Sequence, residues 1–244
     1  MRAMVLAAGL GTRLRPLTND CPKALVEVAS RTLLDITLSR LRRFGINDVI
    51  INAHHCADML SDYLDANQNF GMNIDVSRED VLLDTGGGLK KAAHFFADSN
   101  EPFLLHNVDV LSNIDFRAML QLHLEQSALA TLAVQQRASS RQLLFDGTGQ
   151  LCGRRIKDSP DDLVRPAMQM TPLAFSGIHI ISPRIFTLIQ EAGVFSIVDV
   201  YLRLAKEGEK IVAIRPDEYY WRDLGTLESL RAAEEDVQKG LIAI

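Results

Sequence analysis

Short apolar runs alternate with amphipathic segments along the first half of the chain. Residues 3–7 form an unbroken apolar run of strand length, whereas residues 33–44 repeat leucine and phenylalanine at the spacing of one helix face. Further strands are expected at 49–52, 73–77, 102–107 and 128–134, with helices at 57–64, 89–96 and 116–124. This order predicts an α/β fold in three layers, with a mostly parallel sheet covered by helices on both faces.

The pattern changes after residue 135. A hairpin is expected around Asp-Gly-Thr-Gly-Gln at 146–150, which two short apolar segments flank. The other expected elements are strands at 174–181, 210–214 and 219–222 and helices at 183–192, 198–206 and 227–238. Because no linker or repeat separates the halves, we expect one domain over residues 1–244. In it, residues 136–244 would add a smaller lobe to the sheet that residues 1–135 build.

The composition is that of a globular protein, and it narrows the choice of partners. Of 244 residues, 47% are hydrophobic and 23% are charged, and 26 lysines and arginines stand against 31 aspartates and glutamates, for a formal charge of -5. Nucleic acids and anionic membranes are bound through clustered Lys and Arg, so this acidic balance argues against both as main partners. Any phosphate chemistry must therefore rely on a few well-placed cations.

The cysteines and the N-terminal segment favour a reducing compartment. Cys21, Cys56 and Cys152 are odd in number, far apart and in no C-x-x-C pair, so neither a disulfide framework nor a zinc site is indicated. The apolar run after Arg2 contains Gly9 and is followed by no small-residue cleavage site, and no apolar stretch is long enough to span a membrane. We expect a cytoplasmic protein.

The most informative stretch, LAAGLGTRLRPLT at residues 6–18, follows the first expected strand. Small residues at this place let backbone N–H groups approach a phosphate, and glycine permits the torsions that such a loop requires. A dinucleotide-binding loop would need glycine where Leu14 stands, and the Gly-Lys-Ser/Thr of a Walker A loop is absent. What remains is a long phosphate-facing loop with its own cations, Arg13 and Lys23. The alternative is a simple glycine turn between a strand and a helix.

This run, with Pro-Lys-Ala-Leu at 22–25, resembles the signature of the sugar-1-phosphate nucleotidyltransferases. The resemblance implies a Rossmann-like α/β fold that condenses a nucleoside triphosphate with a sugar 1-phosphate and releases pyrophosphate. Residues 1–135 would then be the nucleotide-binding half and residues 136–244 the sugar-phosphate-binding half. It also implies catalytic roles for Arg13 and Lys23, with Lys23 contacting phosphate. The loop would bind the triphosphate through Ala8, Gly9, Gly11, Thr12 and Arg13.

Two aspartates are candidates for the metal that such a reaction needs. Asp109 follows the strand at 103–107, at the sheet edge where open α/β folds bind ligands, and Asp223 lies in a segment that resembles the family's W-x-D-x-G-T. Carboxylates, phosphate oxygens and water are the ligands of Mg²⁺, so we expect these two residues to bind it, with Asp109 also counted as catalytic. The alternatives are a helix-capping Asp109 and an Asp223 that interacts with a helix dipole.

The base and the sugar are addressed by two further motifs. Asp84-Thr-Gly-Gly-Gly88 removes side chains from one wall, so a base could lie against Gly87 and Gly88, with Asp84 available for hydrogen bonds. The motif is most similar to that of the short family members that make UDP-N-acetylmuramate from N-acetylmuramate 1-phosphate. UTP is therefore favoured, with GTP and dTTP as alternatives. The second motif, Phe-Ser-Gly-Ile at 175–178, resembles the family's strand that lines the sugar pocket, and Lys157 stands where many relatives have a lysine that binds the sugar's phosphate. The resemblance therefore implies sugar-phosphate contacts from Asn107, Lys157 and Gly177.

Other functions stay open on the sequence alone. His54, His55 and His106 have no partners at metal-binding spacing, and the attacking phosphate oxygen is already anionic, so no general base is required. The family usually has glycine where Val108 stands, which keeps a non-catalytic nucleotide-sugar sensor as a second hypothesis. A homo-oligomer is also possible. An NAD-dependent oxidoreductase is disfavoured by Leu14 and Pro16.

Overall fold

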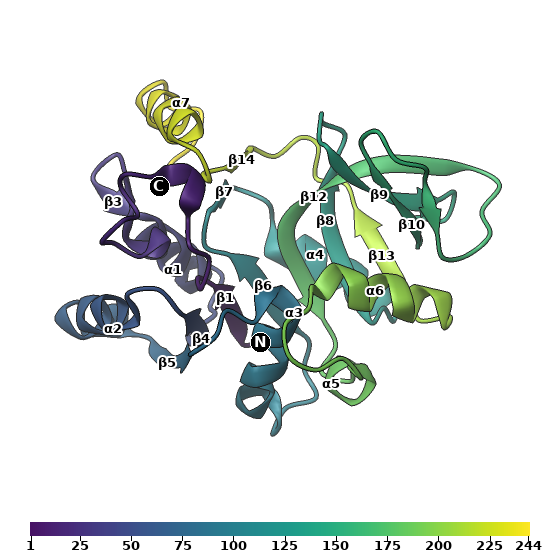
Figure 1. The fold of residues 1–244 in the computed structure, drawn as a ribbon, viewed down its shortest axis with the longest axis horizontal. Coiled ribbons are helices and arrows are strands. Elements are labelled where there is room, and N and C mark those ends of the chain that lie inside the picture. The colour runs from purple at the N-terminus through teal and green to yellow at the C-terminus, as the bar shows by residue number, and fades with distance from the viewer.

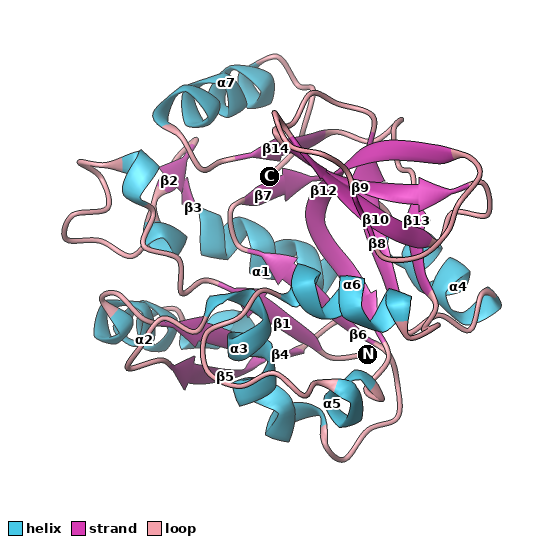
Figure 2. Cartoon of the chain, turned by 45° about the vertical axis from the view of Figure 1, so that its right-hand side comes forward, coloured by secondary structure: helices cyan, strands magenta, loops and turns pink.

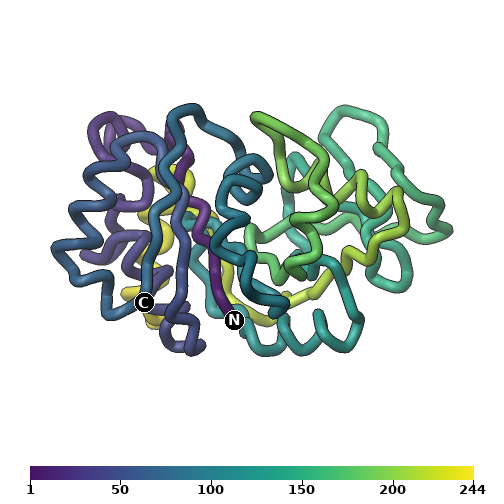
Figure 3. The backbone as a smooth tube through the Cα atoms, turned by 90° about the horizontal axis from the view of Figure 1, so that it is seen from below, coloured from purple at the N-terminus to yellow at the C-terminus, as the bar shows by residue number.

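The computed structural model describes residues 1–244 and has a three-layer α/β architecture around one ten-stranded sheet (Figure 1). The strand order is β11-β10-β9-β12-β6-β1-β4-β5, with β8 paired to β12 and β13 paired to β8. The tube in Figure 3 shows the first half of the chain on one side of the molecule and most of the second half on the other, while the yellow C-terminal segment returns to the side of the first half. The predicted fold class is therefore confirmed.

The first half of the sheet is parallel. Its strands are β1 (Ala3–Leu6), β4 (Asp48–Ala53), β5 (Asn73–Arg78) and β6 (Phe103–Asn107). Its helices are α1 (Leu33–Arg43), α2 (Ala57–Ala66), α3 (Asp84–Lys91) and α4 (Phe116–Glu125). Because β1 lies between β4 and β6, the loop that follows β1 leaves the centre of the carboxyl edge.

The second half joins through β12, which is antiparallel to β6. Its strands are β8 (Ala130–Gln135), β9 (Arg141–Asp146), β10 (Leu151–Ile156), β11 (Asp162–Leu163), β12 (Met170–Ile181) and β13 (Ile211–Ile214). Its helices are α5 (Ile185–Leu188), α6 (Ile197–Lys206) and α7 (Leu227–Gln238). Figure 2 shows α3 beside α6, so the two halves also meet through helices.

Most of the following short elements were not predicted. The exception is the strand expected at 219–222, which the structure has at Trp221–Asp223. Two small antiparallel strand pairs form outside the main sheet. In the first, β2 (Glu27–Val28) pairs with β3 (Arg31–Thr32), and in the second, β7 (Val110–Ser112) pairs with β14 (Trp221–Asp223). The loop after β1 contains two 3₁₀ turns, Thr12–Leu14 and Lys23–Leu25. Segments of two or three residues carry no periodic pattern, so only tertiary pairing defines them.

The helix expected at 183–192 was wrong in length, because α5 ends at Leu188. The carbonyl oxygen of Leu188 accepts a hydrogen bond from Arg203 at 2.9 Å, and that of Glu191 accepts one from Lys90 at 2.5 Å. Side chains from other helices therefore satisfy backbone groups that a longer helix would have paired internally.

The core lies on both faces of the sheet, as the continuous apolar strands predicted. Ala3 and Val5 pack in one hydrophobic cluster, whereas Met4 between them packs in the other, because successive side chains of a strand point to opposite faces. None of the helices combines the length and the apolarity that crossing a bilayer requires.

Three histidines are buried in this core, each 1% exposed, and burial lowers their pKa values. The values fall to about 3 for His106 and His179 and to about 4 for His123. The unfolded chain, with values near 6.5, therefore binds more protons than the folded chain between these limits. The free energy of unfolding must fall as pH falls below about 6.5, by roughly 1.4 kcal/mol per pH unit for each histidine that stays neutral.

We expect urea midpoints to decrease clearly between pH 7.5 and 5.5. The variant His179→Gln, which removes one of the buried groups, should show a shallower decrease. The exposed His94 provides the matched control, and His94→Gln should follow the wild type. Midpoints that are independent of pH over this range would contradict the prediction.

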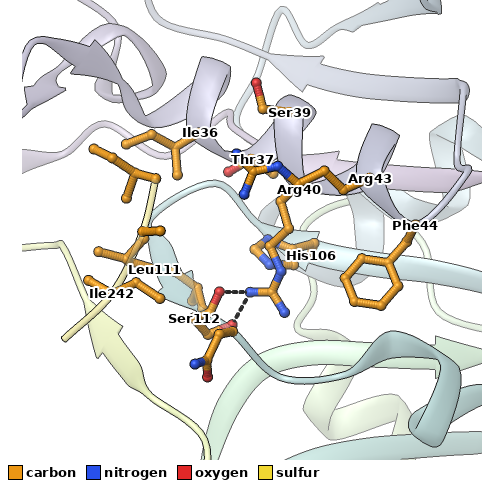
Figure 4. Close-up of a pocket in the computed structure, with 14 residues that line it drawn as sticks. Ile36, Thr37, Ser39, Arg40, Arg43, Phe44, His106, Leu111, Ser112 and Ile242 are labelled. Atoms are coloured by element: carbon orange, nitrogen blue, oxygen red, sulfur yellow. Dashed lines mark hydrogen bonds between the residues drawn. The ribbon is translucent and has the colours of Figure 1, made fainter. Parts of the chain in front are cut away.

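A small cavity of about 140 Å³ lies behind β7, between α1 and the C-terminal residues 242–244 (Figure 4). The guanidinium of Arg40 donates to the carbonyl oxygens of Ser112 and Ile114 there, and the Nε2 atom of His106 has no partner. His106 and the next residue of β6, Asn107, point to opposite faces of the sheet. This cavity is therefore separate from the clefts at the carboxyl edge.

Candidate active site

The loop after β1 folds back on itself at Gly11. This residue has a left-handed conformation with φ +61°, and a Cβ atom there would lie 2.9 Å from Cγ2 of Thr18 and 3.2 Å from Cβ of Lys23. The hydroxyl of Thr18 donates to the carbonyl oxygen of Gly11 at 2.8 Å. Glycine is therefore required at this position for both torsion and space, and the fold-back brings Lys23 toward the start of the loop.

Lys23 and Asp109 form a largely buried ion pair. Their side chains are 12% and 14% exposed, and the ammonium of Lys23 donates to Oδ2 of Asp109. Both residues line a cavity of about 370 Å³ at the carboxyl ends of β1, β4 and β6. The predicted residues Ala8, Gly9, Asp84 and Asn107 also line it. The structure thus brings a cation, a carboxylate and the glycine loop into one cleft.

The small sheet of β7 and β14 brings Asp223 next to Asp109 along the backbone. In the β7–β14 register Asp223 is opposite Val110, and the N–H of Leu224 donates to the carbonyl oxygen of Asp109 at 2.8 Å. The two carboxylates thus come from adjoining backbone segments, although they are far apart in the sequence.

Arg13 approaches the same place from the glycine loop. Its Nη2 atom is 3.8 Å from Oδ1 of Asp223, and the two side chains are 63% and 44% exposed. A Cβ atom at Gly225 would collide with the guanidinium of Arg13 and lie 2.7 Å from Oδ1 of Asp223, to which the Gly225 N–H donates at 2.9 Å. Gly225 therefore leaves room for Arg13. Its place in the Asp-Leu-Gly-Thr segment was visible in the sequence, but its role was not predicted.

A buried amide–carboxylate pair, which was also not predicted, supports the first cavity. Oδ1 of Asn52 accepts from the N–H groups of Ala7 and Ala8 at 2.7 and 3.3 Å, and its Nδ2 donates to Glu79 at 2.7 Å. Glu79 is 4% exposed and also accepts from the N–H of Leu83 at 2.9 Å. This network connects the glycine loop to the start of α3. The available signal was a polar residue at the carboxyl end of a predicted strand.

The three glycines of the Asp84–Gly88 motif lie inside α3 rather than before a helix. A Cβ atom at Gly86 would lie 2.5 Å from the Phe195 ring, and one at Gly88 would lie 2.7 Å from Oε1 of Glu79. Their small size therefore lets α3 pack closely against the start of α6 and the Asn52–Glu79 pair. Asp84 lines the first cavity, whereas contacts of Gly87 and Gly88 with a base stay a prediction.

A second cavity of about 640 Å³ continues from the first and shares Asp84, Thr85 and Asn107 with it. Gly177 has φ +72°, and a Cβ atom there would lie 2.8 Å from Nδ2 of Asn107, so these two predicted sugar contacts are neighbours. Lys157 is exposed one residue beyond β10 and is not among the lining residues. The arginines of the cavity lining are Arg141, Arg154 and Arg155.

The family of the chain follows from its sequence as a whole. Residues 2–240 match the nucleotidyl transferase family, and the chain belongs to this family. It is an enzyme of the sugar-1-phosphate nucleotidyltransferase class, which binds a nucleotide and a sugar phosphate.

Individual relatives agree with this assignment. The chain is 36% identical over 243 residues to an N-acetylmuramate alpha-1-phosphate uridylyltransferase of Caulobacter vibrioides, which covers 95% of each chain. It is 31% identical over 236 residues to the protein of the same description from Neisseria meningitidis, covering 96% of this chain and 97% of that one. A solved UDP-glucose pyrophosphorylase has the same fold, with a TM-score of 0.78 at 20% identity over 98% of each chain.

Proposed function

We propose that this enzyme condenses UTP with N-acetylmuramate 1-phosphate to give UDP-N-acetylmuramate and pyrophosphate. The observation that carries the proposal is the continuity of the two cavities, which meet at Asp84, Thr85 and Asn107. A nucleotide in the first and a sugar phosphate in the second would then lie end to end, with Lys23 and Asp109 beside the first. The choice of base and sugar rests on the two relatives named above.

The two halves of the chain line different cavities. The first is lined mainly by residues before 135 and the second mainly by residues after it. We propose that residues 1–135 bind the nucleotide and residues 136–244 bind most of the sugar phosphate. Asn107, which faces Gly177, would contact the sugar from the nucleotide-binding half.

Magnesium fits the donor set of the cleft. Asp109 and Asp223 stand on adjoining backbone segments, and the chain offers no cluster of three or more metal-binding side chains that would favour a different ion. Two carboxylates with phosphate oxygens and water form the usual environment of Mg²⁺. The ion would supply positive charge at the phosphates, where it offsets the repulsion between two polyanions and the charge of departing pyrophosphate.

The side chains of the chain itself bind and orient the substrates. Arg13, with its planar donor fork, suits the outer phosphates of the nucleotide, and Lys23 suits an oxygen near the reacting phosphorus. The nucleophile is an ionised phosphate oxygen, so proton removal is not needed. Catalysis then consists of aligning the attacking oxygen with the departing pyrophosphate and stabilising the added charge.

A pyrophosphate-release assay with four nucleoside triphosphates and a panel of sugar 1-phosphates tests this function. We expect the largest kcat/KM with UTP and N-acetylmuramate 1-phosphate and no release without a divalent ion. N-acetylglucosamine 1-phosphate is the matched control substrate, since it lacks the lactyl group. Preference for GTP or dTTP would replace the base assignment, and nucleotide binding without turnover would favour a sensor.

A further inference from the structure

The sugar-side strand β12 contains a bulge whose carbonyl groups are paired by side chains. β12 pairs with β8 at Phe175↔Val134 and next at His179↔Leu132, so β12 uses more residues than β8 over this step. The carbonyl oxygen of Phe175 accepts from Nη2 of Arg137 at 2.6 Å, and that of Ser176 accepts from Nε1 of Trp221 at 2.8 Å. Two side chains thus satisfy consecutive backbone groups of the bulge.

These two side chains also contact each other. The guanidinium carbon of Arg137 lies 3.8 Å from the centroid of the Trp221 ring, which is the geometry of a cation–π contact. Arg137 follows β8 at one side of the bulge, whereas Trp221 belongs to β14 and precedes Asp223 by two positions. The pair therefore links the bulge to the strand that carries a candidate metal ligand.

The bulge contributes to a wall of the second cavity, because Phe175 and His179 at its two ends line that cavity. Gly177 is its residue with positive φ, and its α-carbon is so close to Asn107 that a Cβ atom would be 2.8 Å from Nδ2. Pairing of β12 with β6 resumes at Ile178↔His106. A shift of the bulge would therefore displace Gly177 relative to Asn107, where the two cavities meet.

The charge of Arg137 is not neutralised by the protein. No carboxylate lies within ion-pair distance of its guanidinium, and its buried Nε atom has no hydrogen-bond partner. Burial lowers its pKa, and the nearby Asp223 opposes this effect. A partly desolvated cation without a carboxylate partner is costly. Arg137 lines a surface groove together with Trp221, Arg215 and Asp223, so its positive charge lies beside the carboxylate that we assign to Mg²⁺.

We propose that Arg137 and Trp221 are positioning residues for the sugar 1-phosphate: together they fix the Phe175–Gly177 bulge against Asn107 and set its place relative to Asp223. This inference rests on the proposed function of the second cavity. Neither residue needs to touch the reacting atoms. Their effect should therefore fall on sugar-phosphate binding, and the nucleotide should bind as in the unaltered enzyme.

Two variants separate the contributions of the pair. Trp221→Phe keeps an aromatic ring for Arg137 but removes the N–H that donates to Ser176, and Arg137→Gln removes the charge and the ring contact. We expect each to raise KM for the sugar 1-phosphate about tenfold, with KM for the nucleotide changed less than about twofold, as for the loss of one buried hydrogen bond. Arg137→Lys, which retains the charge and one donor, should restore part of the loss.

The exposed Arg215 is a matched control. It lines the surface groove that also contains Arg137 and Trp221, pairs with Asp217 at 2.9 Å and has no hydrogen bond to β12, so Arg215→Gln should leave both KM values unchanged. Trp221 is the only tryptophan of the chain, so its fluorescence reports sugar-phosphate binding without turnover. Titration of the wild type should change the emission, and Arg137→Gln should need about ten times more ligand for the same change.

The outcomes distinguish the inference from the function on which it rests. An active wild type whose variants raise both KM values equally, or neither, would overturn the positioning role. The positioning role would also be overturned if the fluorescence titration gave the same affinity for the sugar phosphate in Arg137→Gln as in the wild type. If the wild type releases no pyrophosphate with any substrate pair, the proposed function fails instead, and the positioning role falls with it.

Discussion

Replacement of Asp109 or Asp223 by asparagine should lower kcat for pyrophosphate release by about three orders of magnitude. Each change keeps the shape of the side chain but removes a negative charge that we assign to Mg²⁺. The remaining neutral amide oxygen is a weak ligand for a hard divalent cation. Initial rates at several Mg²⁺ concentrations check the expectation, and the apparent metal requirement should rise in both variants.

The two variants should differ in stability. Asp109 is 14% exposed and pairs with Lys23, so Asp109→Asn leaves a nearly buried ammonium without its counter-charge and should lower the thermal midpoint. Asp223 is 44% exposed, and Asp223→Asn should melt like the wild type. Asp65→Asn, an exposed change on α2, is the control. Full activity of either active-site variant would exclude that aspartate as a metal ligand.

The variant Arg13→Ala should lose about 100-fold in kcat while the protein remains folded. Arg13 is 63% exposed, and its single ion pair, at 3.8 Å from Asp223, adds little to stability because water screens it. We expect Arg13 to act on catalysis through its attraction to the triphosphate. This interaction is strong only when the substrate has displaced water from the cleft and lowered the effective dielectric constant. Steady-state kinetics together with circular dichroism melting test both parts of the expectation.

Arg15 provides the matched comparison within the same loop. It is exposed and forms no ion pair, so Arg15→Ala removes the same charge two residues away. We expect its kinetics to stay within about twofold of the wild type, because salt largely screens an exposed charge that does not contact the phosphates and lies beyond the Debye length of about 8 Å. Equal losses in the two variants would mean that the net charge of the loop matters and not the position of Arg13.

Local motifs predicted the parts of the site that are local in sequence. The loop at 6–18 combines a buried strand, glycines and a cation within a few residues, and in the structure Gly11 has the positive φ that such a loop needs. The expected βαβ order was confirmed for the same reason, since each strand and helix carries its own periodic pattern. The proposed chemical roles of the individual residues stay predictions.

Parts of the site that depend on tertiary pairing could not be predicted. β7 has only three residues, too few for a pattern, and the strand expected at 219–222 gave no sign of its partner. The pairing of β14 with β7 nevertheless decides that Asp223 lies beside Asp109. Likewise, Asn52 and Glu79 become partners only because β4 and β5 are adjacent in the sheet. In the sequence, the three glycines of α3 resemble a flexible turn, since glycine is a poor helix former. The reason for them is visible only in the structure, where Phe195 and Glu79 leave no room for a Cβ atom at Gly86 and Gly88.

The pairing of β14 with β7 joins two segments that leave the ribosome at different times. Lys23, Asp109 and the glycine loop belong to the half that leaves the ribosome first, and the strands that position them are parallel neighbours within that half. Asp223 arrives only after β12 and β13 have been synthesised. A nascent chain could thus form the cavity beside Lys23 and Asp109 early but would lack Asp223 until its C-terminal segment docks.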